Sequence, residues 1–212
     1  MTSTELMKKL DNYWYYYKWH TYFGIAILIV ILFCVAQSVF NVNPDNSIML
    51  VSKTSPLPPD VSNSIKNDLS QYVIDINKDG KKSLSIMSFD FSSYSPSVLL
   101  ASQVKLQGEL GKSNSFIFLI DDGSYKDNIN QGYFDKIKAV IPNAQTIDDY
   151  RISASSLSVF KDKSYKDDLK NYYLVIRKYK GSKVESPISL IAYQNDMNFL
   201  KRILAESNTI SN

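Results

Sequence analysis

Residues 75–80 (DINKDG) carry the side-chain pattern with which a calcium-binding loop opens. Oxygen-bearing side chains recur at Asp75, Asn77 and Asp79, and alternate positions of this kind can wrap a hard cation. The pattern fails at its far end, because Ile86 stands at the twelfth position, where a bidentate glutamate is expected. These three residues are therefore the candidate Ca²⁺ ligands, and the alternative is a tight polar turn.

A second group of carboxylates follows the predicted strands. Asp90 comes at the end of one strand, and Asp121 and Asp122 come at the end of another. Ligands of open α/β sheets bind at the carboxyl ends of the strands, and neighbouring carboxylates can exchange protons when their environments separate their pKa values. The same residues commonly cap helices and turns, as the pair at 148–149 also could. We therefore assign no catalytic residue.

Composition excludes several other kinds of chemistry. The single histidine, His20, and the single cysteine, Cys34, both belong to the N-terminal region, so the later residues lack imidazole and thiol groups. This excludes Ser-His-Asp and Cys-His nucleophiles there, and nearly all zinc sites. No glycine-rich phosphate loop is present, and the net charge of +3 gives no reason to expect nucleic acid. No cofactor is assigned apart from the possible Ca²⁺.

An uncharged run of 18 residues, 23–40 (FGIAILIVILFCVAQSVF), dominates the chain. As a helix it would be about 27 Å long, close to the ~30 Å hydrocarbon core of a bilayer. Twelve of the 18 residues are Ile, Leu, Val or Phe, which favours insertion by roughly 4–7 kcal/mol before the polar residues subtract their share. We expect a transmembrane helix. The alternative is a signal peptide cleaved near Ala36-Gln37-Ser38.

Aromatic residues crowd the N-terminal side of this run, where residues 12–23 read NYWYYYKWHTYF. Tyr and Trp prefer the headgroup level, where an apolar ring and a polar tip are both satisfied. Three lysines, at 8, 9 and 18, precede the run, and only Lys53 occurs in the 20 residues after it. This bias predicts a cytoplasmic N-terminus and an extracellular C-terminal domain. The residues expected at the membrane interface are Trp14, Tyr16, Tyr17, Trp19 and Tyr22.

The rest of the chain predicts one α/β domain. Its first half alternates strands with helices, and parallel strands need such helical crossovers. We expect a three-layer domain with a mostly parallel sheet and antiparallel additions in the C-terminal half. The predicted strands are 47–52, 84–91, 115–120, 152–160 and 172–179. The predicted helices begin at the cap Asp60, at Ser95-Pro96 (ending near Leu110, before Gly111), at 131 (ending at 139) and at about 195, where Asn195 or Asp196 is the cap.

These elements give five segments. They are a cytoplasmic tail with the aromatic belt (1–22), the transmembrane helix (23–40), a linker (41–47), the extracytoplasmic domain (48–206) and a polar tail (207–212).

Two stretches resemble known families. Residues 12–32, together with the D-x-N-x-D-G-K stretch at 75–81, resemble uncharacterised single-span membrane proteins of clostridia and related Gram-positive bacteria. Residues 106–137 are similar to the first lobe of extracellular solute-binding proteins of sugar-type ABC importers. In that family a helix ends at glycine, a strand follows, and a G-x-hydrophobic helix comes next; Gly111, residues 116–119 and Gly132-Tyr133-Phe134 fit. The resemblance implies a fold relationship and supplies no binding residue.

These observations predict a single-pass protein of the cell membrane whose outer domain binds, senses or assists without catalysis. The lipid bilayer is one expected partner, and a transporter or other membrane protein is another. The alternatives are a carboxylate- or cation-dependent enzyme of the cell envelope, and a structural partner of a membrane complex such as a transporter.

Overall fold

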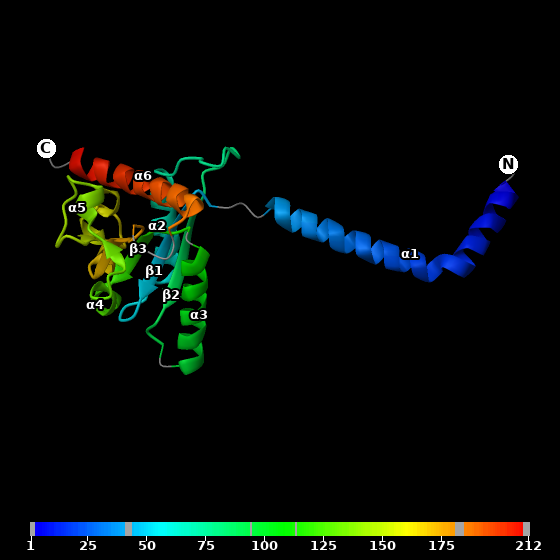
Figure 1. The fold of residues 1–212 in the computed structure, drawn as a ribbon, viewed down its shortest axis with the longest axis horizontal. Coiled ribbons are helices and arrows are strands. Elements are labelled where there is room, and N and C mark those ends of the chain that lie inside the picture. The colour runs from blue at the N-terminus through cyan, green and yellow to red at the C-terminus, as the bar shows by residue number, and fades with distance from the viewer. Residues whose placement is uncertain (1–2, 41–43, 94, 113, 181–184, 210–212) are drawn as a thin grey trace. The chain divides into compact units, whose positions relative to one another are not determined.

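The computed structural model describes residues 3–40, 44–93, 95–112, 114–180 and 185–209 (Figure 1). The chain forms two compact units, Met1–Asn43 and Pro44–Asn212. We describe each by itself. The boundary between the units falls inside the predicted linker, of which residues 41–43 lie outside the described part of the chain.

The first unit consists of one helix, α1 (Ser3–Phe40), of 38 residues. Within it, the 26 residues Asp11–Ala36 are long and apolar enough to cross a membrane, and none of the apolar window is buried inside the structure. The helix forms without interruption because the segment contains no proline and only one glycine, Gly24. The predicted apolar run is therefore helical, and it is long and apolar enough to cross a membrane.

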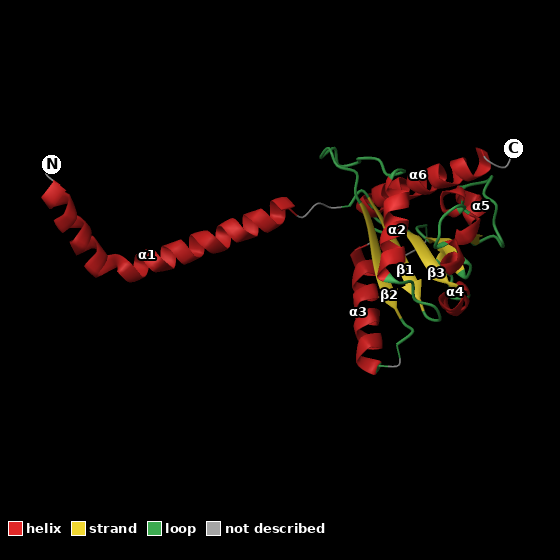
Figure 2. Ribbon diagram, turned by 180° about the vertical axis from the view of Figure 1, so that it is seen from behind, coloured by secondary structure: helices red, strands yellow, loops and turns green. Residues whose placement is uncertain are grey.

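The second unit is built on a six-stranded mixed sheet with the order β2-β1-β3-β6-β4, in which β5 also pairs with β6 (Figures 1 and 2). Strands β1, β2 and β3 are parallel, as the alternating first half of the sequence predicts, and β6 is antiparallel to β3, β4 and β5. The strands are β1 (Asn46–Ser52), β2 (Leu84–Asp90), β3 (Ile117–Asp121), β4 (Phe134–Asp135), β5 (Arg151–Ser153) and β6 (Tyr172–Arg177).

Helices cover both faces of this sheet, because the central strands are apolar on both sides. In β1, Ile48 and Leu50 belong to one buried cluster, which α2 and α6 complete. Met49 and Val51 belong to the other, against which residues of α3 and α4 pack. The helices are α2 (Pro59–Ser70), α3 (Pro96–Lys112), α4 (Asp122–Ile129), α5 (Ile137–Val140) and α6 (Pro187–Thr209).

The first half of the domain follows the prediction except at two helix ends. The predicted cap Asp60 lies inside the first turn of α2, and the N-cap position belongs to Pro58. Helix α3 continues through Gly111 to Lys112. Gly111 is not among the glycines with positive φ, so it does not end the helix in the left-handed way that the prediction assumed.

The second half departs further from the prediction. The predicted helix over 131–139 is wrong: a turn at Gly132 (φ 70°) leads into β4 and the four-residue α5. The predicted strand over 152–160 is reduced to β5, and 3-10 turns follow it. Helix α4 was not predicted, and α6 begins at Pro187 rather than at Asn195. Strand β6 lies inside the sheet, between β3 and the pair β4 and β5, and not at its edge.

Candidate functional site

Parallel pairing brings the ends of β1, β2 and β3 to one edge of the sheet, which we call the carboxyl edge. The register pairs Ser52 of β1 with Asp90 of β2, and Val51 with Ile120 of β3. The predicted carboxylates Asp90 and Asp121 therefore share this edge. Strand β1 separates them, so their Cα atoms are about 10 Å apart at the usual spacing of strands.

Asp121 is fully buried, and its carboxylate accepts hydrogen bonds mainly from backbone amides. One oxygen accepts hydrogen bonds from the amides of Lys53 (2.9 Å) and Thr54 (2.6 Å) and from the Thr54 hydroxyl (2.7 Å). The other accepts from the amide of Ser124 (2.8 Å) and caps α4. Burial alone raises the pKa, but the hydrogen bonds from Ser124 and Thr54 outweigh it and lower the pKa of Asp121 to about 2. Asp121 joins the loop after β1 to the start of α4, which is a structural role.

Asp90 lies beside an open groove of about 390 Å³ between β2 and α3. Its carboxylate accepts a hydrogen bond from the amide of Ser92 at 2.8 Å. The groove lining combines Asp90 and Lys105, of opposite charge, with serine hydroxyls and small apolar side chains. Such a lining can hold a small polar group, and it includes the predicted carboxylate Asp90.

Arg151 organises a cluster at the carboxyl edge that the sequence did not predict. Its guanidinium lies between two tyrosine rings, 4.5 Å from the ring centre of Tyr125 and 4.4 Å from that of Tyr173. Its Nε donates to Asp148 at 2.9 Å, and its Nη1 pairs with Asp122 at 3.5 Å. The four partners come from three separate segments, namely α4, the loop before β5 and strand β6, so no local pattern in the sequence could indicate the cluster.

The same cluster holds the hydroxyl of Tyr125, which donates to Asp148 at 3.1 Å. Burial, and then the charge of Asp148, raise the pKa of Tyr125 to about 12. Asp148 also accepts from the amides of Tyr150 (2.9 Å) and Arg151 (3.0 Å). Each charge of the cluster therefore has a partner within it, which favours a role in joining α4, β5 and β6.

Asp196 lies at the opposite edge of the sheet, where the parallel strands begin, which we call the amino edge. It is buried in the middle of α6 and does not cap it as predicted. Its two oxygens accept from the Asn46 side-chain amide (3.0 Å) and the Phe116 amide (2.8 Å). Burial raises the pKa of Asp196 to about 7, although these hydrogen bonds act in the other direction. The signal in the sequence was a lone acid on the apolar face of a helix, misread as a helix start.

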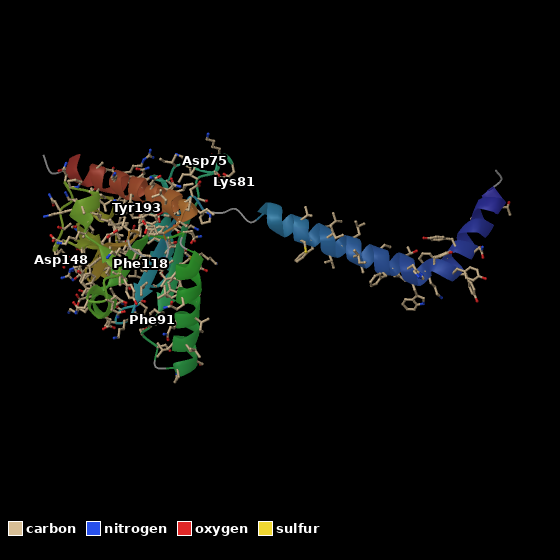
Figure 3. All side chains as sticks on the ribbon, viewed as in Figure 1. Asp75, Lys81, Phe91, Phe118, Asp148 and Tyr193 are labelled. Atoms are coloured by element: carbon tan, nitrogen blue, oxygen red, sulfur yellow. The ribbon has the colours of Figure 1, made fainter. Side chains whose placement is uncertain are left out.

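The candidate calcium ligands lie together in one exposed loop near the amino edge; Figure 3 shows Asp75 at the end of the domain away from Phe91. Their side-chain oxygens accept hydrogen bonds from backbone amides of the same loop. Asp75 accepts from Gly80 (2.9 Å), Asn77 from Asp79 (3.0 Å) and Asp79 from Lys81 (2.8 Å). Among the described residues, no group of three His, Cys, Asp or Glu side chains has the arrangement of a metal site. The geometry is that of a turn whose side chains stabilise its own backbone.

The five residues expected at the membrane interface all lie on α1 with exposed side chains, between 47% for Trp14 and 74% for Trp19. Trp14 and Trp19 both meet the ring of Tyr22 edge-on, with ring centres 5.5 and 6.3 Å apart. The aromatic rings thus cover the surface of one part of the helix without support from a protein core.

The search for relatives gives the chain no family assignment. No protein-family model matches it, and no match was found among curated proteins or solved structures. The resemblances to single-span proteins and to a solute-binding lobe therefore stay predictions.

Proposed function

We propose that this protein is anchored in the cell membrane by α1 and holds its α/β domain outside the cell as a binding, sensing or accessory module without catalysis. The anchor is supported by the 26-residue apolar segment with its exposed surface, and by the aromatic rings that precede it. The lysine bias across the segment supports a cytoplasmic N-terminus.

The observation that carries the binding role is the exposed apolar surface of α3. This helix has no fully buried residue. Its inner side rests on the sheet through half-buried Leu106 and Leu110, whereas Val98, Leu100 and Val104 are 46%, 62% and 63% exposed. An exposed apolar surface beside a groove is typical of a contact site for another protein. We propose that the partner is a membrane protein such as a transporter.

Site-specific photo-crosslinking in growing cells tests this role. A photoreactive residue at Leu100 or Val104 should give a discrete product of higher mass, whereas the same residue at the exposed Lys66 of α2 should not. The variant Val104→Glu should remove the product from Leu100 while leaving the protein folded and in the membrane fraction. Equal crosslinking at Lys66 and Val104, or none at either α3 position, would refute the binding role.

The groove beside Asp90 favours a second candidate, an enzyme of the cell envelope that uses carboxylates or a bound cation. Asp90 and Lys105 would then bind a polar substrate, and Asp75, Asn77 and Asp79 would supply oxygen ligands to Ca²⁺. A rise in the unfolding temperature with Ca²⁺ that Asp75→Asn and Asp79→Asn remove would support the cation. No shift with Ca²⁺ would count against it.

A further inference from the structure

We infer that the domain docks on the membrane surface through α6, with the outward face of this helix in the headgroup layer of anionic lipids. The inference rests on the proposed membrane span. It goes further by assigning a lipid contact to the domain itself, in addition to the contact that the span makes.

The first observation is the length of chain that joins the two units. Only residues 41–45 separate the end of α1 at Phe40 from the start of β1 at Asn46. Even when fully extended, this segment spans about 20 Å. If α1 crosses the bilayer, the start of β1 must lie within that distance of the hydrocarbon boundary, so the amino edge of the sheet is held next to the lipid headgroups.

The second observation places α6 at this edge. The buried carboxylate of Asp196 accepts from the side chain of Asn46, the first residue of β1, and from the amide of Phe116, just before β3. Figures 1 and 2 show α6 running across this end of the domain, with its N-terminal turns near the start of β1. The helix therefore lies beside the point of attachment.

The third observation is the chemistry of the outward face of α6. Ile188 and Ile191, one turn apart, are 81% and 58% exposed. Asn198 and Arg202 continue the same stripe, and Lys201 lies beside it, all exposed. Of the two acids of the helix, Asp196 is buried, and the exposed Glu206 lies one turn after Arg202 and is bonded to the Tyr72 hydroxyl. Apolar side chains followed by cations on one face are typical of helices that lie in the membrane interface.

The loop at 76–83 adds further cations at the same edge. The Asp45 carboxylate, next to the attachment point, accepts from the amides of Ile76 (2.8 Å) and Ser83 (2.9 Å) and holds this loop in place. The loop exposes three lysines and one acid, Asp79, so its charge is positive, and Figure 3 shows Lys81 at this end of the domain. A second copy of the chain meeting α6 face to face would oppose cation to cation, whereas an anionic lipid surface complements this charge. The exposed lysines are Lys78, Lys81 and Lys82.

Depth-dependent fluorescence quenching of the full chain in vesicles tests the docking. The cysteine-free background Cys34→Ser would carry Ile191→Cys labelled with an environment-sensitive dye. Its matched control is Ser97→Cys, an exposed position on α3 at the carboxyl edge. In vesicles with phosphatidylglycerol, lipids that carry a quencher near the headgroup should quench the label at 191 several-fold more than the label at 97. The double variant Lys201→Glu, Arg202→Glu should lower the affinity of the domain for the anionic lipid surface by about fivefold or more for each cation removed.

The possible outcomes separate the two proposals. Equal quenching at 191 and 97 in a chain that resists alkaline extraction would overturn the docking and leave the span intact. A shifted emission at 191 that no quencher lipid affects would show that protein covers this face, and would also overturn the docking. Release of the chain by alkaline extraction would refute the span, and the docking with it. Thermal unfolding of each variant serves as the folding control.

Discussion

Two buried aspartates have pKa values that are shifted in opposite directions. Asp121 accepts from a dense set of amides and a hydroxyl, so its pKa falls to about 2. Asp196 is more deeply buried and has fewer donors, so desolvation dominates and its pKa rises to about 7. The balance between desolvation and hydrogen bonds to the charged form decides the direction of the shift.

The change Asp121→Asn should destabilise the domain by about 3 kcal/mol, because an amide cannot accept all the hydrogen bonds that the carboxylate accepts. The pKa of Asp121 is lower in the folded protein than in the unfolded chain. Its contribution is therefore present above pH ~4 and is lost as the pH falls toward ~2, by about 2 kcal/mol. Urea unfolding from acidic to neutral pH measures both effects. The control is Asp127→Asn, at an exposed ion pair with Lys53, which should change stability by less than about 1 kcal/mol.

The change Asp196→Asn should remove a pH dependence of opposite sign. The folded protein keeps the proton of Asp196 up to pH ~7, whereas the unfolded chain loses it near pH ~4. The stability of the natural protein should therefore fall by about 2 kcal/mol between pH ~5 and pH ~8 through this group alone, and the variant should lack that fall. Urea unfolding at both pH values measures it. A slope unchanged by the substitution would show that Asp196 is ionised throughout.

At the scale of elements, the loop after β1 and the start of α4 meet too closely for any side chain at residue 123. A Cβ on Gly123 would lie 2.7 Å from Cγ2 of Thr54. Gly123→Ala should therefore cost about 1–3 kcal/mol. Thr54→Ser removes that methyl group and keeps the hydroxyl that Asp121 binds, so the double variant should recover most of the loss.

A double-mutant cycle in urea measures this coupling. Gly108→Ala in α3 is the matched control, because nothing lies within 4 Å of the new Cβ. It should stabilise the helix by about 0.5–1 kcal/mol. Additive effects of Gly123→Ala and Thr54→Ser would rule out the close contact.

Arg151 connects α4, β5 and β6, and its replacement should loosen all three. Arg151→Lys keeps the charge but loses the flat contact with Tyr125 and Tyr173 and the directed bond to Asp148. We expect a loss of about 1–2 kcal/mol. Hydrogen exchange should report it as faster exchange in α4 and β6, with β2 unchanged. Uniform faster exchange over the whole domain would indicate global destabilisation instead.

The elements that the sequence predicts well are those with strong local signals. The first three strands are apolar runs, and α2 shows its inner face in the spacing of Val61, Ile65 and Leu69, all buried. Residues 122–160 lack such signals, because their secondary structure depends on contacts with residues that are distant in the sequence. The start of α6 was missed for a related reason: Asp196 has the chemistry of a cap, and only the tertiary partners Asn46 and Phe116 reveal it as a buried group.

At the scale of the whole molecule, the sequence predicted the apolar helix, the mixed α/β domain and the presence of carboxylates at one sheet edge. It could not predict which of these carboxylates already accept hydrogen bonds from the protein's own backbone. Asp121 and its partners Lys53 and Thr54 are separated by 67 or more residues, so only the folded chain shows that the carboxylate is occupied. The exposed surface of α3 could not be predicted either, because the sequence does not show which apolar residues of the helix the sheet leaves uncovered.

The anchored arrangement, with the domain outside the cell, is the claim on which the proposed function and the docking depend. Labelling single cysteines in intact cells with a membrane-impermeant maleimide tests it most directly, in the Cys34→Ser background. Lys161→Cys, exposed in the α/β domain, should react without permeabilisation, and Thr4→Cys, exposed near the start of α1, should react only after it. If Lys161→Cys reacts only in permeabilised cells, the domain faces the cytosol and the proposed orientation is wrong.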